Sequence, residues 1–487
     1  MVNVVFIRIV LSYLSLELAG TWFLFVSIGM YLAYLDLGIS PTVSREISFV
    51  LGRGELSADE KDAEIAGIIA TCLRMFQVIS LTVLMAGLLV GWLYLPHVVP
   101  PADMDQATMA WLVFNMGAAL NVLGGAAFVS LYGMGNIATE KIIRSFTLLG
   151  GLALSVTFLK LGLGMVGLAI AWLVQNLIAR LAGWVMLYRQ NPGLRGHKAR
   201  PSMEVFRRIT IPSLKWAGIS LGALLLFQTD NPIIAGIFGP AHIAPYEAVA
   251  KIGFALLTFS ILTVHSSIPF ISQAYAAGDS AGLERLLMRN VRYGMSIMMI
   301  LVSFFAFFGQ SVINVWIGEG NFVGYPVLLA LLAALTLEVH HAIHSSAVMG
   351  AGKIVFIRIT LISGGLKLFL SLMLALRYGI WGVPVGTCIA ILATNLWYSL
   401  RVSLGVFHIS LKSYIINAVL PLMGLGAALL LGGLAARSVL AGSNDILSIM
   451  GGMTMLFSVG TAVTWGLLMT DNEKRRIIEK LRGFVSS

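Results

Sequence analysis

The sequence predicts an all-α membrane protein with about fourteen transmembrane helices, arranged as two pseudo-symmetric six-helix lobes plus two C-terminal helices. Three observations lead to this prediction. Of the 487 residues, 58% are hydrophobic and 11% are charged, whereas soluble domains carry about 25% charged residues. The apolar runs are continuous over about 20 residues, the length of a helical span, without the alternation of a transmembrane β-barrel. Part of the chain also repeats.

The spans are delimited by Gly, Pro and charged clusters. The first is shorter than a bilayer requires, so we expect the start of this helix to be missing from the sequence. It has no small-residue cleavage site, which disfavours a signal peptide. The expected spans are 1–16, 19–39, 65–95, 108–133, 139–160, 164–188, 210–238, 243–270, 291–317, 324–349, 354–376, 380–401, 412–436 and 446–470.

Lys and Arg give the orientation, because they stay on the cytoplasmic side of membrane proteins. With both termini cytoplasmic, 23 of these residues lie near cytoplasmic connections and 3 near outer ones. This bias accounts for the net charge of +10 better than a nucleic-acid partner does. The two cysteines, Cys72 and Cys388, fall inside spans, which excludes an outer disulfide framework and a thiolate metal cluster.

The expected organisation is an N-lobe (1–189), a basic cytoplasmic linker (190–209), a C-lobe (210–401) and a last part (402–487) holding two spans and the tail. The longest polar segments, 40–64, 189–209 and 271–290, are expected as cytoplasmic loops too short to fold into a domain.

An internal repeat supports the two lobes. Residues 132–170 parallel residues 349–385, with paired glycines and an arginine at similar distances. Because each lobe holds an even number of spans, both have the same orientation, which is the parallel-repeat architecture of alternating-access transporters. The matched pairs are Gly133 with Gly350, Gly135 with Gly352, Arg144 with Arg358, Gly164 with Gly379, and Gly167 with Gly382.

Ionisable residues at membrane depth mark candidate functional positions, because burying them in lipid is costly. The richest stretch is 224–252, where Asp230 and Lys251 reach similar depth and Glu247 shares a helical face with Lys251. Pro232 cannot donate a helical hydrogen bond, so we expect a kink or break near Asp230. The alternative to a functional role is a structural ion pair between two helices.

Four cations are candidates for a positively charged lumen that binds an anionic headgroup, such as a diphosphate: Arg8, Lys215, Arg74 and Lys251. Lys215 and Arg74 lie near cytoplasmic ends, where snorkelling is the alternative. Candidate ion-coupling or gating residues are Asp230, Glu247, Asp36, His265, His340 and His344. Arg180 and Lys367 are weaker candidates because their spans are expected to be peripheral.

The run LEVHHAIHSS (337–346) places His340 and His344 one turn apart, with Glu338 nearby. A third zinc ligand is not evident, so we expect no metal site. A proton-responsive lining and structural hydrogen bonding between helices remain the alternatives. The sequence has no catalytic triad and no Walker motif, so we predict no catalytic residues, no cofactor and no enzymatic activity.

Several segments resemble the multidrug/oligosaccharidyl-lipid/polysaccharide (MOP) exporter superfamily, and within it the bacterial O-antigen and polysaccharide repeat-unit flippases. They are YLAYLDLGISPTVSREIS (31–48), FQTDNPIIAGIFGPAHIAPYEAVAKI (227–252), IPFISQAYAAGD (268–279) and the two glycine-rich repeats. The resemblance covers most of the chain. It implies that Arg8, Asp36, Asp230 and Lys251 fall in lumen-lining helices.

The resemblance further implies transport of an undecaprenyl-diphosphate-linked oligosaccharide across the bacterial inner membrane by alternating access, driven by ions or the membrane potential. The expected partners are this glycan lipid, the bilayer, and glycan polymerases or glycosyltransferases, with no nucleic acid. Alternatives in the same superfamily are a drug or metabolite antiporter and a lipid II flippase. A membrane glycan polymerase or ligase is disfavoured, because such enzymes need a sizeable outer loop.

Overall fold

In a computed structural model of the chain, which describes residues 2–36, 38–197, 199–353, 355–440, 446–475 and 478–479, regular structure is helical throughout. Contacts divide the chain into two units, Met1–Ala244 and Pro245–Ser487. Thirteen helical segments of the described residues are long and apolar enough to cross a membrane. The 12-residue α1 (Val2–Tyr13) lies where the first span was expected. These observations confirm the prediction of a multi-pass α-helical membrane protein with about fourteen helices.

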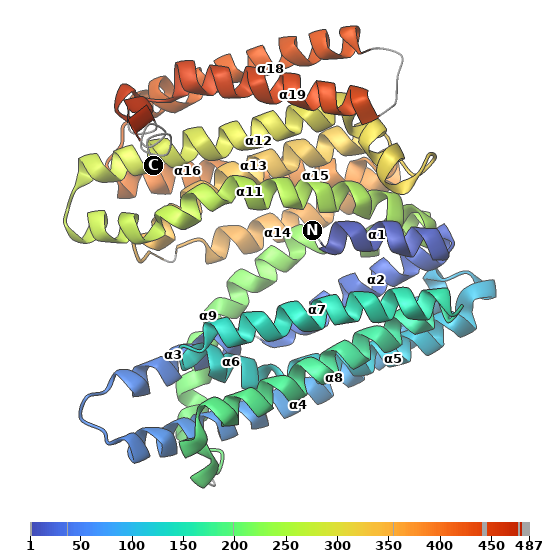
Figure 1. Cartoon of the computed structure of the whole chain (residues 1–487), viewed down its shortest axis with the longest axis vertical. Helices are drawn as coiled ribbons and strands as arrows, with labels where there is room; N and C mark the ends of the chain where they lie inside the picture. Colours follow the sequence, from blue (N-terminus) through green and yellow to red (C-terminus); the bar gives the residue numbers. More distant parts are fainter. Residues whose placement is uncertain are drawn as a thin grey trace. The chain divides into compact units, whose positions relative to one another are not determined.

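The first unit is a bundle in which α4, α5, α7 and α8 run side by side (Figure 1). Its core includes an aromatic cluster, in which the ring of Trp111 lies 4.8 Å from that of Phe25 and 5.8 Å from that of Phe114. The helices of this unit are α1, α2 (Leu16–Ala33), α3 (Ile39–Gly52), α4 (Ala58–Val98), α5 (Met104–Leu123), α6 (Gly125–Gly133), α7 (Ile137–Lys160), α8 (Gly164–Gln190), α9 (Met203–Phe227) and α10 (Asp230–Phe238).

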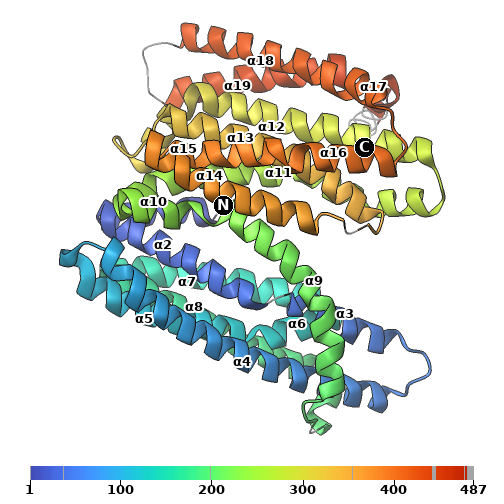
Figure 2. The ribbon, with the colours of Figure 1, turned by 180° about the vertical axis from the view of Figure 1, so that it is seen from behind.

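The second unit is built on contacts of α13 with α12, α15 and α16, as seen from behind in Figure 2. Its helices are α11 (Ile243–Ala276), α12 (Ser280–Ile317), α13 (Tyr325–Gly350), α14 (Ile357–Tyr378), α15 (Gly382–Ala393), α16 (Asn395–Val406), α17 (Leu411–Tyr414), α18 (Leu420–Val439) and α19 (Ile446–Val463).

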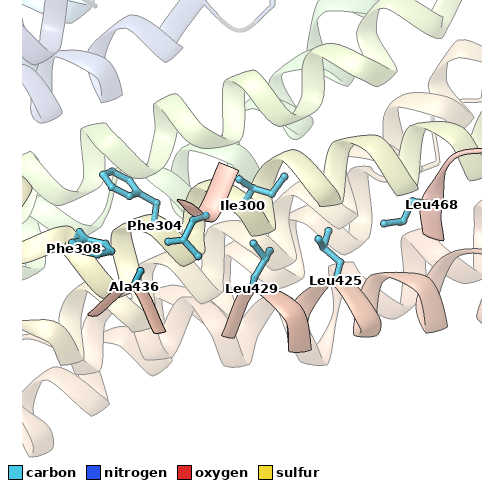
Figure 3. Packing of buried hydrophobic residues seen from close by; sticks show 8 residues of the cluster. Ile300, Phe304, Phe308, Leu425, Leu429, Ala436 and Leu468 are labelled. Atoms are coloured by element: carbon cyan, nitrogen blue, oxygen red, sulfur yellow. The ribbon is translucent and has the colours of Figure 1, made fainter. Parts of the chain in front are cut away.

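The two C-terminal spans pack on the second unit through an apolar seam. Phe304 and Phe308 of α12 meet Leu425 and Leu429 of α18 and Leu456 of α19 (Figure 3). Gly452 of α19 permits the close approach, since a Cβ there would lie 2.3 Å from the Phe308 ring. Apolar burial of this kind contributes about 25 cal/mol per Å². The last two helices therefore have their own packing surface on α12.

The repeated segments adopt the same local conformation. Gly135 has φ 82° and Gly352 has φ 79°, a left-handed conformation that glycine adopts without steric cost. In both turns the residue after the glycine donates its N–H to the carbonyl five residues earlier, at 2.9 and 3.2 Å respectively. This is the Schellman pattern that ends a helix. The paired glycines of the sequence thus have the same conformational role in each unit.

A serine hydroxyl braces each of these two turns from a neighbouring helix. In the first unit Ser48 of α3 donates to the carbonyl oxygen of Gly133 at 2.8 Å. In the second unit Ser272 of α11 donates to the carbonyl oxygen of Gly350 at 2.6 Å. Such contacts satisfy carbonyls that a helix end leaves without a partner. The likeness between the units extends from sequence to individual hydrogen bonds.

The expected loop at 40–64 is wrong, because α3 occupies residues 39–52 and α4 begins at Ala58. One side of α3 is buried, with Ile39, Val43, Ile47 and Val50 at helical spacing. Its Ser, Arg and Glu residues masked that amphipathic pattern. The expected loops at 189–209 and 271–290 are also shortened, since α9 begins at Met203 and α12 at Ser280.

The structural division and the expected lobes differ in where the seventh span is placed. Helices α9 and α10 belong to the first unit, whereas the repeat assigns residues 210–238 to the C-lobe. The lobe boundaries and the linker at 190–209 stay predictions.

Candidate functional site

The seventh span is broken next to Asp230, as Pro232 predicts. Helix α9 ends at Phe227, and α10 begins at Asp230 after two intervening residues. The N–H of Gln228 still bonds to the carbonyl of Leu224 at 2.9 Å, and Pro232 offers no N–H to continue the ladder. Broken helices are the usual places where transporters present backbone groups to a substrate or ion.

Side chains from two other helices of the first unit hold this break. The amide nitrogen of Asn231 donates to the hydroxyl of Ser27 on α2 at 2.7 Å. The hydroxyl of Tyr94 on α4 donates to the carbonyl oxygen of Pro232 at 2.9 Å. Both contacts are part-buried or buried, so they fix the geometry of the break. Sequence reasoning identified the break but none of these holding residues.

Close backbone packing adds a further contact beyond α10. A Cβ at Gly20 of α2 would lie 1.7 Å from the carbonyl oxygen of Pro240. Only glycine permits this approach. The outer end of the seventh span, in the predicted orientation, therefore lies directly against α2.

The other end of α9 is tied to the first unit by charges. The guanidinium of Arg208 lies 2.9 Å from a carboxylate oxygen of Glu46 on α3 and 3.4 Å from one of Glu64 on α4. Arg53 also contacts Glu64, at 2.9 Å. The Glu46 side chain is only 10% exposed, so Arg208 supplies charge compensation that this carboxylate needs.

Two hydroxyl contacts reinforce the same end. Ser213 of α9 donates to the hydroxyl of Thr42 on α3 at 3.0 Å, and both residues are buried. The N–H of Ser202 donates to the hydroxyl of Thr71 on α4 at 3.0 Å. Helix α9 is thus attached to α3 and α4 at one end, while α10 is attached to α2 and α4 at the other. From the sequence, Arg208 was expected only as part of the basic cytoplasmic linker (190–209).

In the second unit, Lys251 and Glu247 form an ion pair on α11, with 3.0 Å between the ammonium nitrogen and a carboxylate oxygen. Their side chains are 27% and 13% exposed. The i, i+4 spacing places them on one face, as the sequence indicates. The predicted pairing of Lys251 with Asp230 involves residues of different units and stays a prediction.

The histidines of α13 lie in a hydrogen-bonded cluster inside the second unit. Tyr414 has its hydroxyl 2.7 Å from Nε2 of His340 and 3.1 Å from Nε2 of His344. Nδ1 of His344 lies 2.6 Å from the hydroxyl of Ser403 on α16. These contacts favour the helix-to-helix hydrogen-bonding alternative. Among the residues that the structure describes, no group of three or more His, Cys, Asp or Glu is placed to hold a metal ion.

The remaining predicted residues are scattered. Arg8 and His265 are exposed, and Arg74 donates to the side-chain oxygen of Gln77 at 3.2 Å. Asp36 is half-buried and accepts the N–H of Ser40 at 3.3 Å, which caps the start of α3. The side chain of Lys215, on α9, lies outside the described part of the chain. Their roles in a lumen stay predictions.

Residues 136–320 match a family model described as a polysaccharide biosynthesis protein. The probable low-salt glycan biosynthesis flippase Agl15 of Haloferax volcanii is 24% identical over 276 residues, which cover 56% of this chain and 55% of the relative. The match therefore spans about half the length of that curated relative. This level of similarity confirms the resemblance to polysaccharide flippases.

Two solved structures extend the likeness to most of the chain. The lipid II flippase MurJ, in an inward closed conformation, has a TM-score of 0.71 at 13% identity and covers 96% of this chain and 98% of its own. A multidrug resistance MATE family transporter of the MOP superfamily, facing inward, has a TM-score of 0.68 at 17% identity, covering 84% and 95%. These two structures confirm the predicted multi-pass helical fold. These similar proteins are flippases and a transporter.

Proposed function

We propose that this chain is a flippase that moves a lipid-linked oligosaccharide across the membrane, from the cytoplasmic to the outer leaflet. The substrate is an undecaprenyl-diphosphate-linked repeat unit of O-antigen or another polysaccharide, and the membrane is the bacterial inner membrane with both termini cytoplasmic. The observation that carries the proposal is the similarity to a glycan biosynthesis flippase over 276 residues. The polysaccharide family model supports it over residues 136–320.

The transport step is alternating access. The diphosphate binds to the cationic residues Arg8, Arg74, Lys215 and Lys251, while the polyprenyl tail stays in lipid. Lys supplies a compact charge and Arg a bidentate fork for phosphate. The break at Asp230 lets the seventh span bend as the cavity opens to the other side.

Glu247 is the residue that we propose for coupling transport to protons. In the ion pair, the Glu247 carboxylate neutralises Lys251 at 3.0 Å. The substrate diphosphate competes with this carboxylate for the ammonium group of Lys251. The membrane potential is the other energy source, because moving one charge through 100 mV is worth about 2.3 kcal/mol. Asp36, Asp230, His265, His340 and His344 complete the set of candidate coupling residues.

The two rival functions are a drug or metabolite antiporter and a lipid II flippase, since a multidrug resistance transporter and a lipid II flippase share the fold. The glycan-flippase relative and the polysaccharide family model favour an oligosaccharide substrate over both. The expected partners are glycosyltransferases, which would build the lipid-linked oligosaccharide, and a glycan polymerase, which would use it after transport.

The test is complementation of a bacterial strain that lacks its own repeat-unit flippase. Wild-type chain should restore surface polysaccharide. Replacing Arg8, Lys251 or Asp230 by Ala should abolish it at unchanged membrane abundance, whereas K160A, which removes an exposed cation of α7, should not. Full complementation by all three variants would reject the proposed site. If the chain restored only drug resistance, its function would be that of the antiporter. If it restored only peptidoglycan synthesis, its substrate would be lipid II.

A further inference from the structure

An aromatic ring in the first unit lies against two guanidinium groups. The central guanidinium carbon of Arg144 on α7 is 4.7 Å from the centroid of the Phe128 ring on α6. That of Arg180 on α8 is 4.8 Å from the same centroid. Cation–π attraction of this kind is strongest where the charge is shielded from water. Three helices therefore bring two arginines, 36 positions apart in sequence, to one site.

Arg180 is buried to an extent unusual for arginine. The residue is 7% exposed, and its Nη2 donates to the side-chain oxygen of Asn121. Its Nε and Nη1 are buried without a hydrogen-bond acceptor among the described residues. Gly124 makes room for the side chain, because a Cβ there would lie 2.1 Å from Cδ of Arg180. The fold thus provides a place for this cation and leaves part of its donor capacity unused.

The charges around Phe128 do not balance. Glu140, which is 4% exposed, forms ion pairs with Arg144 and, at 3.2 Å, with Lys141. Its burial requires this compensation. With Arg180 included, three cations share one carboxylate, which leaves the group with two positive charges. An uncompensated buried cation at membrane depth is costly and usually faces a partner.

The group is accessible through its outer members. The side chain of Arg144 is 52% exposed and that of Lys141 is 66% exposed. Both lie in the first two turns of α7, so Arg144 is about 10 Å along the helix from its beginning. In the predicted orientation this end of α7 is cytoplasmic, and basic pockets between helices on that side suit phosphate headgroups.

We propose that Lys141, Arg144 and Arg180 form a phosphate-binding site for a lipid headgroup, separate from the charges assigned to the transport lumen. Lys141 and Arg144 contact the phosphate at the surface, and the unused donors of Arg180 lie behind them. Arginine forks bind phosphate oxygens in pairs. The phosphate comes either from an anionic phospholipid or from a polyprenyl diphosphate. The site does not depend on whether the chain transports anything.

The experiment measures thermal stability of the purified full-length protein. One arm titrates inorganic pyrophosphate in detergent at fixed ionic strength. The other compares phosphatidylcholine bilayers with and without phosphatidylglycerol. At least one of the two additions should raise the Tm of the wild type, with R144Q weakening its apparent affinity about tenfold. The matched control is K160Q, which removes an exposed cation at the other end of α7 and should respond as the wild type does.

The two arms identify the source of the phosphate. A response to phosphatidylglycerol alone assigns the site to bilayer lipid, and a response to pyrophosphate assigns it to a diphosphate headgroup. K141Q tests the site without touching the buried Arg180, whose removal can prevent folding. The proposal is overturned if the wild type responds to neither addition, or if R144Q and K141Q respond as K160Q does. Arg144 and Arg180 then serve only to pack α7 and α8 on Phe128.

Discussion

At the scale of single residues, the Lys251–Glu247 pair can serve either structure or transport. Two half-shielded charges one turn apart stabilise a helix by a few tenths of a kcal/mol. Reversing their order changes the stability by no more than a similar amount. A role in diphosphate binding does require the ammonium group at position 251. Exchanging the two residues separates the alternatives, because the pair is kept while the cation moves about 6 Å along α11.

We predict that the variant E247K/K251E keeps a Tm within a few degrees of the wild type and loses surface-polysaccharide synthesis. The single variant K251A should lose the same activity. Thermal melting of the purified protein and immunoblots of surface glycan measure the two effects. Normal polysaccharide from the exchanged pair would show that Lys251 and Glu247 only stabilise α11.

A second residue-scale prediction concerns Glu473, beyond the last span. Burial acts to raise the pKa of this carboxyl, but hydrogen bonds from the backbone and hydroxyl of Thr470, together with Arg292, outweigh it and lower the pKa. One Glu473 oxygen accepts the N–H of Thr470 at 2.8 Å and lies 3.8 Å from a guanidinium nitrogen of Arg292. The carboxylate therefore helps to hold residues 470–475 against α12 at Arg292.

A lowered folded-state pKa means that this contribution is fully present above the unfolded value of about 4.3 and is lost as pH falls through the folded value. We expect the amide-exchange protection factors of residues 470–475 in the wild type to fall as pH drops below the unfolded value of Glu473. In E473Q these protection factors should already be low at neutral pH, with little further change. Equal protection of both proteins at neutral pH would contradict this role of Glu473.

At the scale of elements, α9 depends on Arg208 for its attachment to α3 and α4. We predict that R208A destabilises the protein by about 1–3 kcal/mol, because it removes the nearer cation of the mostly buried Glu46 and leaves only Arg45, at 3.5 Å. The neighbouring Arg207 is exposed, so R207A serves as control and should change the Tm little. Thermal melting compares the two variants. Equal Tm values would mean that the ion pairs of Arg208 contribute nothing to holding α9.

The break between α9 and α10 gives a second prediction at this scale. In P232A the new N–H can donate to the carbonyl of Gln228 and lengthen the helix. We expect unchanged or higher thermal stability together with several-fold lower transport, since the bend is lost. P212A is the matched control, because Pro212 lies inside the continuous helix α9. Transport by P232A at the wild-type rate would show that the break is not used.

The elements could be predicted from sequence where apolar runs are long, and not where a helix is amphipathic and polar. The spans corresponding to α7, α8 and α13 begin and end within two residues of their expected positions. Helix α3 was missed, because Arg45 and Glu46 lie among its buried apolar residues. A helical-period search of residues 39–52 would have found it.

The contacts that α3 makes with other helices could not be predicted from the sequence for the same reason. With Glu46 expected in a loop, nothing indicated a contact with Arg208. Likewise, nothing in the sequence distinguishes Phe128 from the other apolar residues of its span. Only the packing of α6 against α7 and α8 shows that Arg144 and Arg180 contact its ring. Contacts between distant segments depend on helix packing, which composition and periodicity do not specify.

At the scale of the whole molecule, the multi-pass helical fold could be predicted from the repeat and from span counting, whereas the MOP superfamily was suggested by a resemblance of sequence segments. The repeat is visible again in the left-handed glycines Gly135 and Gly352 and in the hydroxyls that brace their turns. The predicted lumen does not follow from these features, because Arg8 and Arg74 belong to the first unit and Lys251 to the second. A common site for these residues stays a prediction.

The central claim is that the chain flips a lipid-linked oligosaccharide, and reconstitution tests it most directly. Proteoliposomes carrying a polyprenyl-diphosphate oligosaccharide in one leaflet would be sampled by an external glycosidase, with and without an imposed membrane potential. Wild-type protein should expose the protected glycan to the enzyme far faster than protein-free vesicles do, and K251A should not, while R207A should behave as wild type. A protected fraction that stays as stable as in protein-free vesicles, under every gradient applied, would contradict the claim.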